Sequence, residues 1–108
     1  MTEPADAASA SPENRPPEGA IVRVLPIVNS KGLHARAAAQ FVLTVEKFDA
    51  EVTVTRGHET VGGTSIMGLL MLSAATGTSI TVTAAGAQAA EVMAALEALV
   101  AGRFGEGE

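Results

Sequence analysis

The sequence contains no cysteine, tryptophan or tyrosine, and its only aromatic residues are three phenylalanines. Without cysteine, neither disulfides nor thiolate chemistry is available. Aromatic side chains are scarce but hydrophobic residues make up 47% of the chain, so a core has to be built from aliphatic residues and alanine. The chain also lacks an apolar run of about 18 residues, and its first twenty residues lack an apolar signal-peptide core. We therefore expect a cytoplasmic protein without membrane insertion.

Positive charge is scarce as well. The net charge is −5, and the seven lysines and arginines are scattered singly, which leaves no basic stripe to follow a phosphate backbone. This distribution argues against binding to nucleic acid. Neither His34 nor His58 has an acidic neighbour at the spacing of a metal site, so we predict no metal and no cofactor.

A chain of 108 residues is long enough for one core but not for two. Residues 1–19 are rich in proline, alanine, serine and glutamate, and they contain too few apolar side chains to offset the entropy of ordering. We predict a disordered tail over residues 1–19, one folded domain over 20–104 and a flexible C-terminus over 105–108.

Hydrophobic periodicity predicts the first elements of the domain. Residues 21–28 are rich in β-branched side chains and predict a strand. Pro26 places that strand at a sheet edge, because proline has no N–H to donate to a neighbouring strand. Residues 35–47 have apolar side chains on one helical face, and residues 51–56 alternate like a half-buried strand. A turn then leads to a short partner strand over 60–62, which completes a hairpin.

The second half of the domain predicts a two-turn helix over 66–72, with an N-cap from Thr64 or Ser65. A strand over 78–84 and an amphipathic helix over 88–101 follow. The order β-α-β-β-α-β-α predicts an α+β fold, an open-faced sandwich with a four-stranded antiparallel sheet and three helices on one face.

One short segment has the features of an anion site. Gly32 permits a turn with positive φ, His34 stands where the helix over 35–47 begins, and Arg36 follows two residues later. Unpaired N–H groups and the positive end of the helix dipole stabilise an anion at this place. A lone histidine more often caps a helix or fills a gap on the surface. The local features alone therefore favour neither this interpretation nor a phosphate site over the other.

Two separated motifs make the chain resemble the HPr family of bacterial phosphocarriers over about residues 21–104. The first is Gly-Leu-His-Ala-Arg at 32–36, followed by Ala-Gln-Phe-Val at 39–42. The second is Thr-Ser-Ile-Met-Gly at 64–68 with Leu69 and Leu72. The family fold, an open-faced β-sandwich with three helices on one side, agrees with the element order predicted from periodicity.

The resemblance implies that His34 accepts phosphate on Nδ1 from enzyme I and passes it to a IIA-type protein of the phosphoenolpyruvate-dependent phosphotransferase system. Arg36 matches the family's active-site arginine. The backbone amides of Ala35, Arg36 and Ala37 are expected to bind the phosphate. Many family members have proline at the position of Ala37, where alanine preserves the helix and adds one donor.

The resemblance also assigns a regulatory site and a partner surface. Ser65 matches the serine that HPr kinase/phosphorylase modifies, although an ordinary N-cap is the plainer interpretation. Leu69 and Leu72 are expected in the core. The expected docking patch consists of Ile66, Met67, Leu70 and Met71.

The string of residues 69–72 and the segment 48–51 resemble the nitrogen-related branch of the family, often called NPr. We expect a monomer that takes part covalently in phosphoryl transfer and is no stand-alone enzyme. The alternative is a regulatory binding module that has lost phosphotransfer and acts through Ser65. The presence of both His34 and Arg36 argues against this alternative.

Overall fold

The computed structural model describes residues 19–106. The tail predicted for residues 1–19 therefore lies outside the described residues except for Gly19, as do residues 107 and 108. The predicted order of elements is confirmed, with β1 ending at Pro26 rather than at residue 28. The elements are β1 (Ile21–Pro26), α2 (Ala35–Glu46), β2 (Glu51–Arg56), β3 (Glu59–Gly62), α3 (Ile66–Met71), β4 (Ser79–Ala85), α4 (Ala89–Ala101) and a short 3₁₀ helix, η2 (Arg103–Gly105).

The four strands form one antiparallel sheet in the order β1-β4-β2-β3. This order confirms that β1 lies at an edge, where Pro26 needs no donor for a further strand. The register sets Leu25 beside Ile80 and Val54 beside Val82, and all four side chains are buried. The strands therefore present one apolar face to the core.

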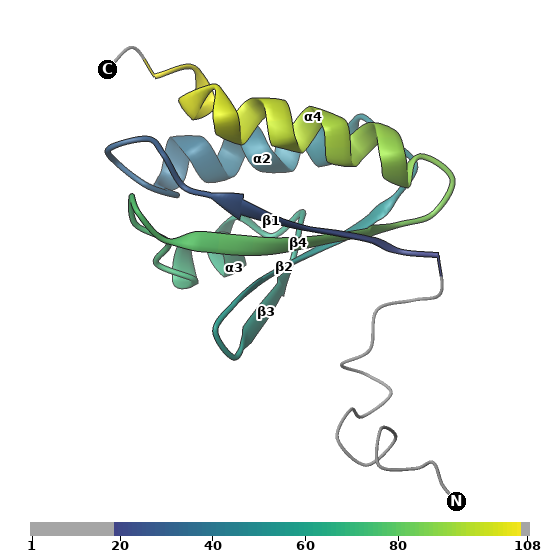
Figure 1. Cartoon of the computed structure of the whole chain (residues 1–108), viewed down its shortest axis with the longest axis horizontal. Coiled ribbons are helices and arrows are strands. Elements are labelled where there is room, and N and C mark those ends of the chain that lie inside the picture. The colour runs from purple at the N-terminus through teal and green to yellow at the C-terminus, as the bar shows by residue number, and fades with distance from the viewer. Residues whose placement is uncertain (1–18, 107–108) are drawn as a thin grey trace, which may run out of the picture.

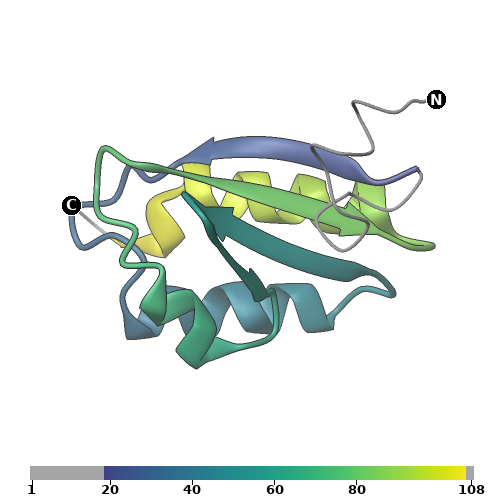
Figure 2. The same cartoon turned by 90° about the horizontal axis from the view of Figure 1, so that it is seen from below.

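Helices α2 and α4 lie side by side over the apolar face of the sheet (Figure 1), and α3 packs beside α2 and β3 (Figure 2). The buried face of α2 consists of small and medium side chains around Phe41, which is completely buried. Leu69 is completely buried and Leu72 nearly so, as predicted. Within residues 19–106 no helix has the length and apolar character needed to cross a membrane.

The loop between β1 and α2 is fixed to the segment that follows α3. Leu33 N–H donates to the Ala74 carbonyl over 2.8 Å. Gly32 has φ +68°, and a Cβ at this position would stand 2.5 Å from the Ala74 oxygen and 2.9 Å from Ala75 Cα. Glycine is thus required here both for its conformation and for its lack of a side chain.

The C-terminal end of the described chain folds back onto the same loop. After α4 ends at Ala101 with Gly102 as its C-cap, Arg103 and Phe104 both have positive φ, at 59° and 55°, and Phe104 is buried. This turn carries Glu106 to the loop, where it contacts Asn29 and His34. The predicted domain boundary at residue 104 leaves out Gly105 and Glu106, although Glu106 is in contact with the domain.

Replacing Gly32 by alanine should cost more stability than the same change at Gly57, which also has positive φ but has nothing within 4 Å of the added Cβ. Gly57→Ala should lower the free energy of unfolding by about 1–2 kcal/mol, the cost of the left-handed conformation. Gly32→Ala should lower the free energy of unfolding by roughly 1–3 kcal/mol more than Gly57→Ala does, because the new methyl group overlaps backbone atoms. Urea denaturation measures both values, and equal losses would contradict the close approach to Ala74.

Candidate functional site

His34 is the N-cap residue of α2, with extended backbone at φ −81° and ψ −177°. Its side chain is 28% exposed. The first bond of the helix runs from Ala38 N–H to the His34 carbonyl over 2.8 Å. The amides of Ala35, Arg36 and Ala37 precede that bond, so the helix provides no carbonyl for them. The histidine thus stands beside three N–H groups at the positive end of the helix dipole.

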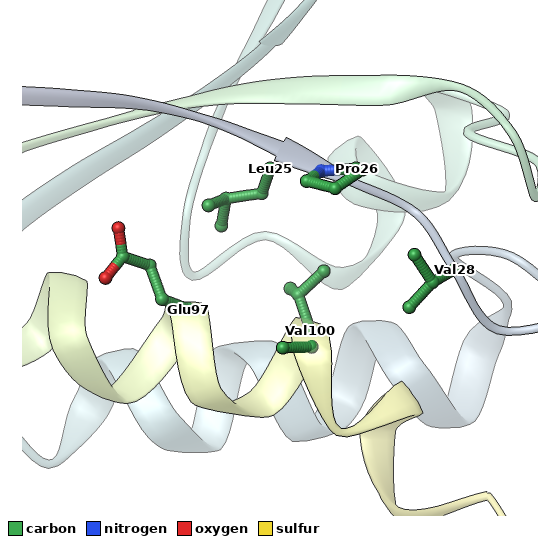
Figure 3. A pocket seen from close by; sticks show the side chains of 6 residues that line it. Leu25, Pro26, Val28, Glu97 and Val100 are labelled. Atoms are coloured by element: carbon green, nitrogen blue, oxygen red, sulfur yellow. The ribbon is translucent and has the colours of Figure 1, made fainter.

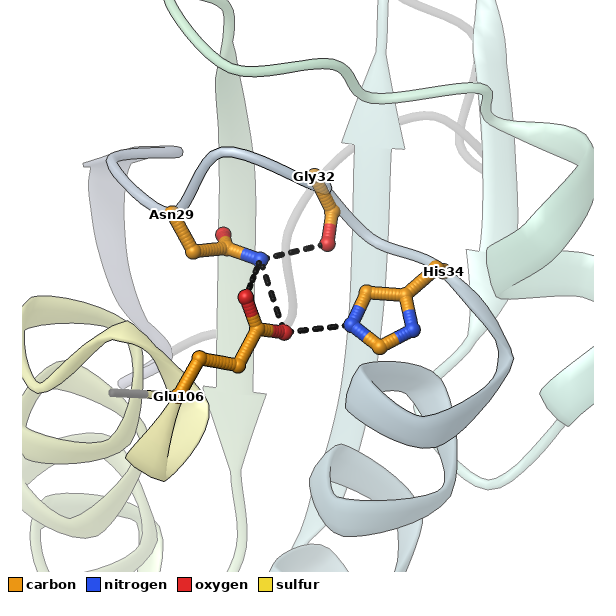
Figure 4. A network of polar contacts seen from close by, with 4 residues as sticks. All are labelled: Asn29, Gly32, His34 and Glu106. Atoms are coloured by element: carbon orange, nitrogen blue, oxygen red, sulfur yellow. Dashed lines mark hydrogen bonds and ion pairs between the residues drawn. The ribbon is translucent and has the colours of Figure 1, made fainter. Parts of the chain in front are cut away.

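A carboxylate engages one of the two ring nitrogens of His34. Glu106 Oε2 lies within hydrogen-bonding distance of His34 Nε2, and both side chains are mostly buried (Figure 4). Asn29 Nδ2 donates to the two oxygens of Glu106 at 3.3 and 3.2 Å and to the Gly32 carbonyl at 2.8 Å. The loop before α2, through Asn29, and the segment after η2, through Glu106, therefore jointly fix the position of the imidazole.

The hydrogen bond with His34 lowers the pKa of Glu106 below its ordinary value of 4.5. Desolvation opposes this shift, whereas the Asn29 amide and the electrostatic interactions with His34 and Lys31 add to it. Glu106 is therefore ionised at neutral pH. A carboxylate can only accept a hydrogen bond, so the proton of the neutral imidazole lies on Nε2 and Nδ1 has the free lone pair.

Arg36 is exposed in the second position of α2, and within residues 19–106 its guanidinium forms no ion pair or hydrogen bond. An open hollow of about 230 Å³ lies beside the histidine. It is lined by Lys31, Leu33, His34, Ser73, Ala74 and Ala75. The hollow therefore has a lysine and a histidine on its lining, two side chains that can interact with an anion.

The second predicted site lies at the start of α3. Ser65 is the N-cap residue, and its Oγ accepts from Gly68 N–H over 3.0 Å. On the helix itself Ile66, Met67 and Met71 are exposed at 42%, 67% and 66%. Leu70, which we expected in the same patch, is half-buried and packs against the core.

An apolar hollow of about 310 Å³ lies between the end of β1 and the last turns of α4 (Figure 3). Leu25, Pro26, Val28 and Val100 contribute carbon surface, and Glu97 is its only titratable group. No histidine, serine or lysine lines it, so it offers no acceptor for a transferred group. Of these two hollows, the one beside His34 contains a nucleophilic side chain.

The sequence reasoning missed Asn29 and Glu106. Glu106 stands 72 residues after His34, and no periodicity or motif links two positions so far apart. Asn29 stands outside every motif and every predicted element, although it is completely buried. Such a buried amide needs fixed partners, which only the folded chain identifies.

A histidine at a helix N-terminus, with one ring nitrogen free and an exposed arginine two residues later, suits a protein that carries a phosphoryl group. Residues 21–102 match the family described as "PTS HPr component phosphorylation site". The chain belongs to this HPr family and is a phosphocarrier of the phosphotransferase system.

Relatives and solved structures agree with this assignment. The chain is 52% identical to phosphocarrier protein HPr of Neisseria meningitidis over 82 residues, which cover 76% of this chain and 92% of the relative. It is 39% identical to phosphocarrier protein NPr of Shewanella violacea, over 78% of this chain and 92% of that one. The crystal structure of HPr-C-His from Thermoanaerobacter tengcongensis matches with a TM-score of 0.78 and 35% identity, covering 82% of this chain and 99% of the other.

The lowered pKa of Glu106 predicts a stability that depends on pH. A carboxyl whose pKa is lowered on folding stabilises the native state above its ordinary value of 4.5, and this contribution disappears as the pH falls through the lower folded value. Glu106→Gln should therefore destabilise the protein at pH 6, and this effect should shrink as the pH is lowered below 4.5. Urea denaturation across this range measures the difference.

The His34→Ala background is the control for the pH dependence of Glu106. If His34 is the main cause of the shift, Glu106→Gln should have a smaller effect in this background, and the effect should vary less with pH. An unchanged effect would contradict the His34–Glu106 contact.

Proposed function

We propose that His34 is the residue of this phosphocarrier that accepts the phosphoryl group, on Nδ1. The observation that carries the proposal is the state of the imidazole: Nε2 faces Glu106, while Nδ1 has no partner within residues 19–106. A phosphoryl group needs such an unprotonated nitrogen as its nucleophile.

The transferred phosphoryl group needs compensation for its negative charge. We assign this role to the Arg36 guanidinium and to the backbone amides of Ala35, Arg36 and Ala37. Transfer between two histidines exchanges one phosphorus–nitrogen bond for another, so the carrier contributes mainly positioning and charge compensation. Enzyme I is the proposed donor and a IIA-type protein the proposed acceptor, both in the cytoplasm.

The two methionines of α3, Met67 and Met71, form the proposed docking surface together with Ile66. Three large apolar side chains exposed on six residues of helix are unusual for a surface that stays in water. Methionine adapts to differently shaped partners, which suits a carrier that has to bind a donor and an acceptor in turn. Leu70 is half-buried, so only the exposed part of its side chain can contribute to this docking surface.

Ser65 is the proposed regulatory site. Its side chain is exposed and stands at the first turn of α3, beside the proposed docking surface. Phosphorylation by an HPr kinase/phosphorylase would add about two negative charges there. These charges would repel acidic partner groups and weaken docking. A module controlled through Ser65 without phosphotransfer remains the rival function.

The branch of the family stays a prediction. An NPr shares 39% of its aligned residues with the chain, whereas the meningococcal HPr shares 52%. The nitrogen-related branch is therefore supported by the apolar string in α3 rather than by overall identity. We further propose that the protein acts as a monomer.

Incubation of the full chain with phosphoenolpyruvate and its own enzyme I should add one phosphate that is lost in acid, as measured by intact mass. His34→Ala should remove the modification, and His58→Ala, at an exposed hairpin turn, should retain it. Arg36→Ala should slow transfer by about tenfold, the loss of one charge-assisted contact. An acid-stable phosphate at Ser65, with none at His34, would favour the rival function.

The docking surface predicts that Met67→Ser combined with Met71→Ser weakens binding to phosphorylated enzyme I by roughly tenfold or more. Val24→Thr is the matched control, because Val24 is 65% exposed but lies on the open face of β1, away from the helices. Titration followed by calorimetry measures both affinities. Equal affinities for the two variants would exclude α3 as the docking surface.

A further inference from the structure

The contact between Glu106 and His34 is fixed by the chain on both sides. Arg103 and Phe104 adopt the left-handed conformation, which is strained for side chains of this size. The buried ring of Phe104 anchors the turn, and Glu106 N–H closes it on the Arg103 carbonyl over 2.9 Å. A strained and anchored turn directs the carboxylate to the imidazole, so the contact is specific to this backbone path.

Two further groups hold the carboxylate in place. The completely buried Asn29 donates to both of its oxygens, and the same amide is fixed by the Gly32 carbonyl in the loop before α2. Lys31, from the same loop, adds a favourable charge. Glu106 thus has a defined position relative to His34, as a carboxylate that orients a ligand or nucleophile needs.

We propose that Glu106 is a positioning residue for phosphoryl transfer, holding the His34 proton on Nε2 and stabilising the positive charge that the ring acquires when Nδ1 is phosphorylated. This inference rests on the proposed role of His34. It assigns to the end of the chain a part in the transfer step itself.

The charge of the His34 ring changes during the transfer step, and this change explains why a carboxylate helps. The Nδ1 lone pair of His34 forms the new bond to phosphorus, and the donor nitrogen leaves with the electron pair of the bond that breaks. The Nε2 proton stays in place, so the acceptor ring changes from neutral to cationic as the phosphoryl group arrives. A fixed carboxylate on Nε2–H stabilises this charge as it develops.

The same contact supports the return step. When the P–N bond of a cationic phosphoimidazole breaks, the electron pair returns to Nδ1 and the ring leaves as neutral imidazole. A phosphoimidazole without the Nε2 proton would have to release the much poorer leaving group imidazolate. Glu106 keeps the Nε2 proton in place after the transfer and so leaves His34 ready to release the phosphoryl group to the next protein. The geometry therefore favours transfer in both directions.

The test compares Glu106→Gln, Glu106→Asp and the control Glu97→Gln. Glu97 lies on α4 in an exposed ion pair with Arg23 of β1, so the control removes the same charge away from the site. Nitrogen-15 spectra of the unphosphorylated full chain give the tautomer of each histidine, and exposed His58 provides the reference in the same sample. Single-turnover transfer from phosphorylated enzyme I gives the maximal rate and the half-saturating concentration separately.

In wild type His34 should be almost entirely the Nε2–H tautomer, unlike His58. Glu106→Gln should lower the maximal rate about tenfold with an unchanged half-saturating concentration, because a charge-assisted hydrogen bond becomes a neutral one. Glu106→Asp, which retains the charge, should recover part of the rate. Glu97→Gln should behave as wild type.

A wild-type tautomer mixture at His34 like that of His58 would overturn the inference. So would a Glu106→Gln variant with the wild-type rate, or one in which only the half-saturating concentration changes, since the latter identifies a docking contact. Absence of any acid-labile phosphate on wild type would instead refute the acceptor role of His34, while the tautomer measurement would still decide whether Glu106 fixes the ring.

Discussion

The close approach of Gly32 to the backbone of Ala74 and Ala75 is the constraint on which the site depends. It joins the loop before α2 to the segment after α3, with the Leu33–Ala74 hydrogen bond as its directional part. His34 follows immediately, so this contact sets where the imidazole stands relative to α3. The start of α2, with His34, and helix α3 are thereby held side by side, although they come from different halves of the chain.

The C-terminal turn adds a third segment to this region. Phe104 is anchored in the core, and Glu106 reaches the imidazole from the side opposite the α2 amides (Figure 4). The two ring nitrogens consequently have different environments: one faces a carboxylate and the other a helix N-terminus. This asymmetry is electrostatic as well as geometric, because negative charge lies at Nε2 and partial positive charge at Nδ1.

The elements could be predicted from sequence because each has its own short-range signal. Val52 and Val54 alternate with polar residues, the apolar residues of α2 recur at helical spacing, and Pro26 indicated an edge strand that the topology confirms. The Gly-Leu-His-Ala-Arg motif likewise lies within five consecutive residues. Asn29 and Glu106 could not be found in this way, because their roles arise from a contact between the two ends of the domain. Leu70, expected in the docking patch, is half-buried against the core, and the extent of its burial depends on how α3 packs in the folded chain.

The buried amide of Asn29 has a consequence for the balance between folding and function. Its Nδ2 bonds three acceptors, whereas its Oδ1 is buried without a partner among the described residues. An unsatisfied buried oxygen of this kind costs roughly 1–3 kcal/mol. The amide cannot be turned over to relieve it, because that would point the oxygen at the carboxylate and at the Gly32 carbonyl. The fold therefore tolerates a local loss of stability while one donor stays directed at the Glu106 carboxylate.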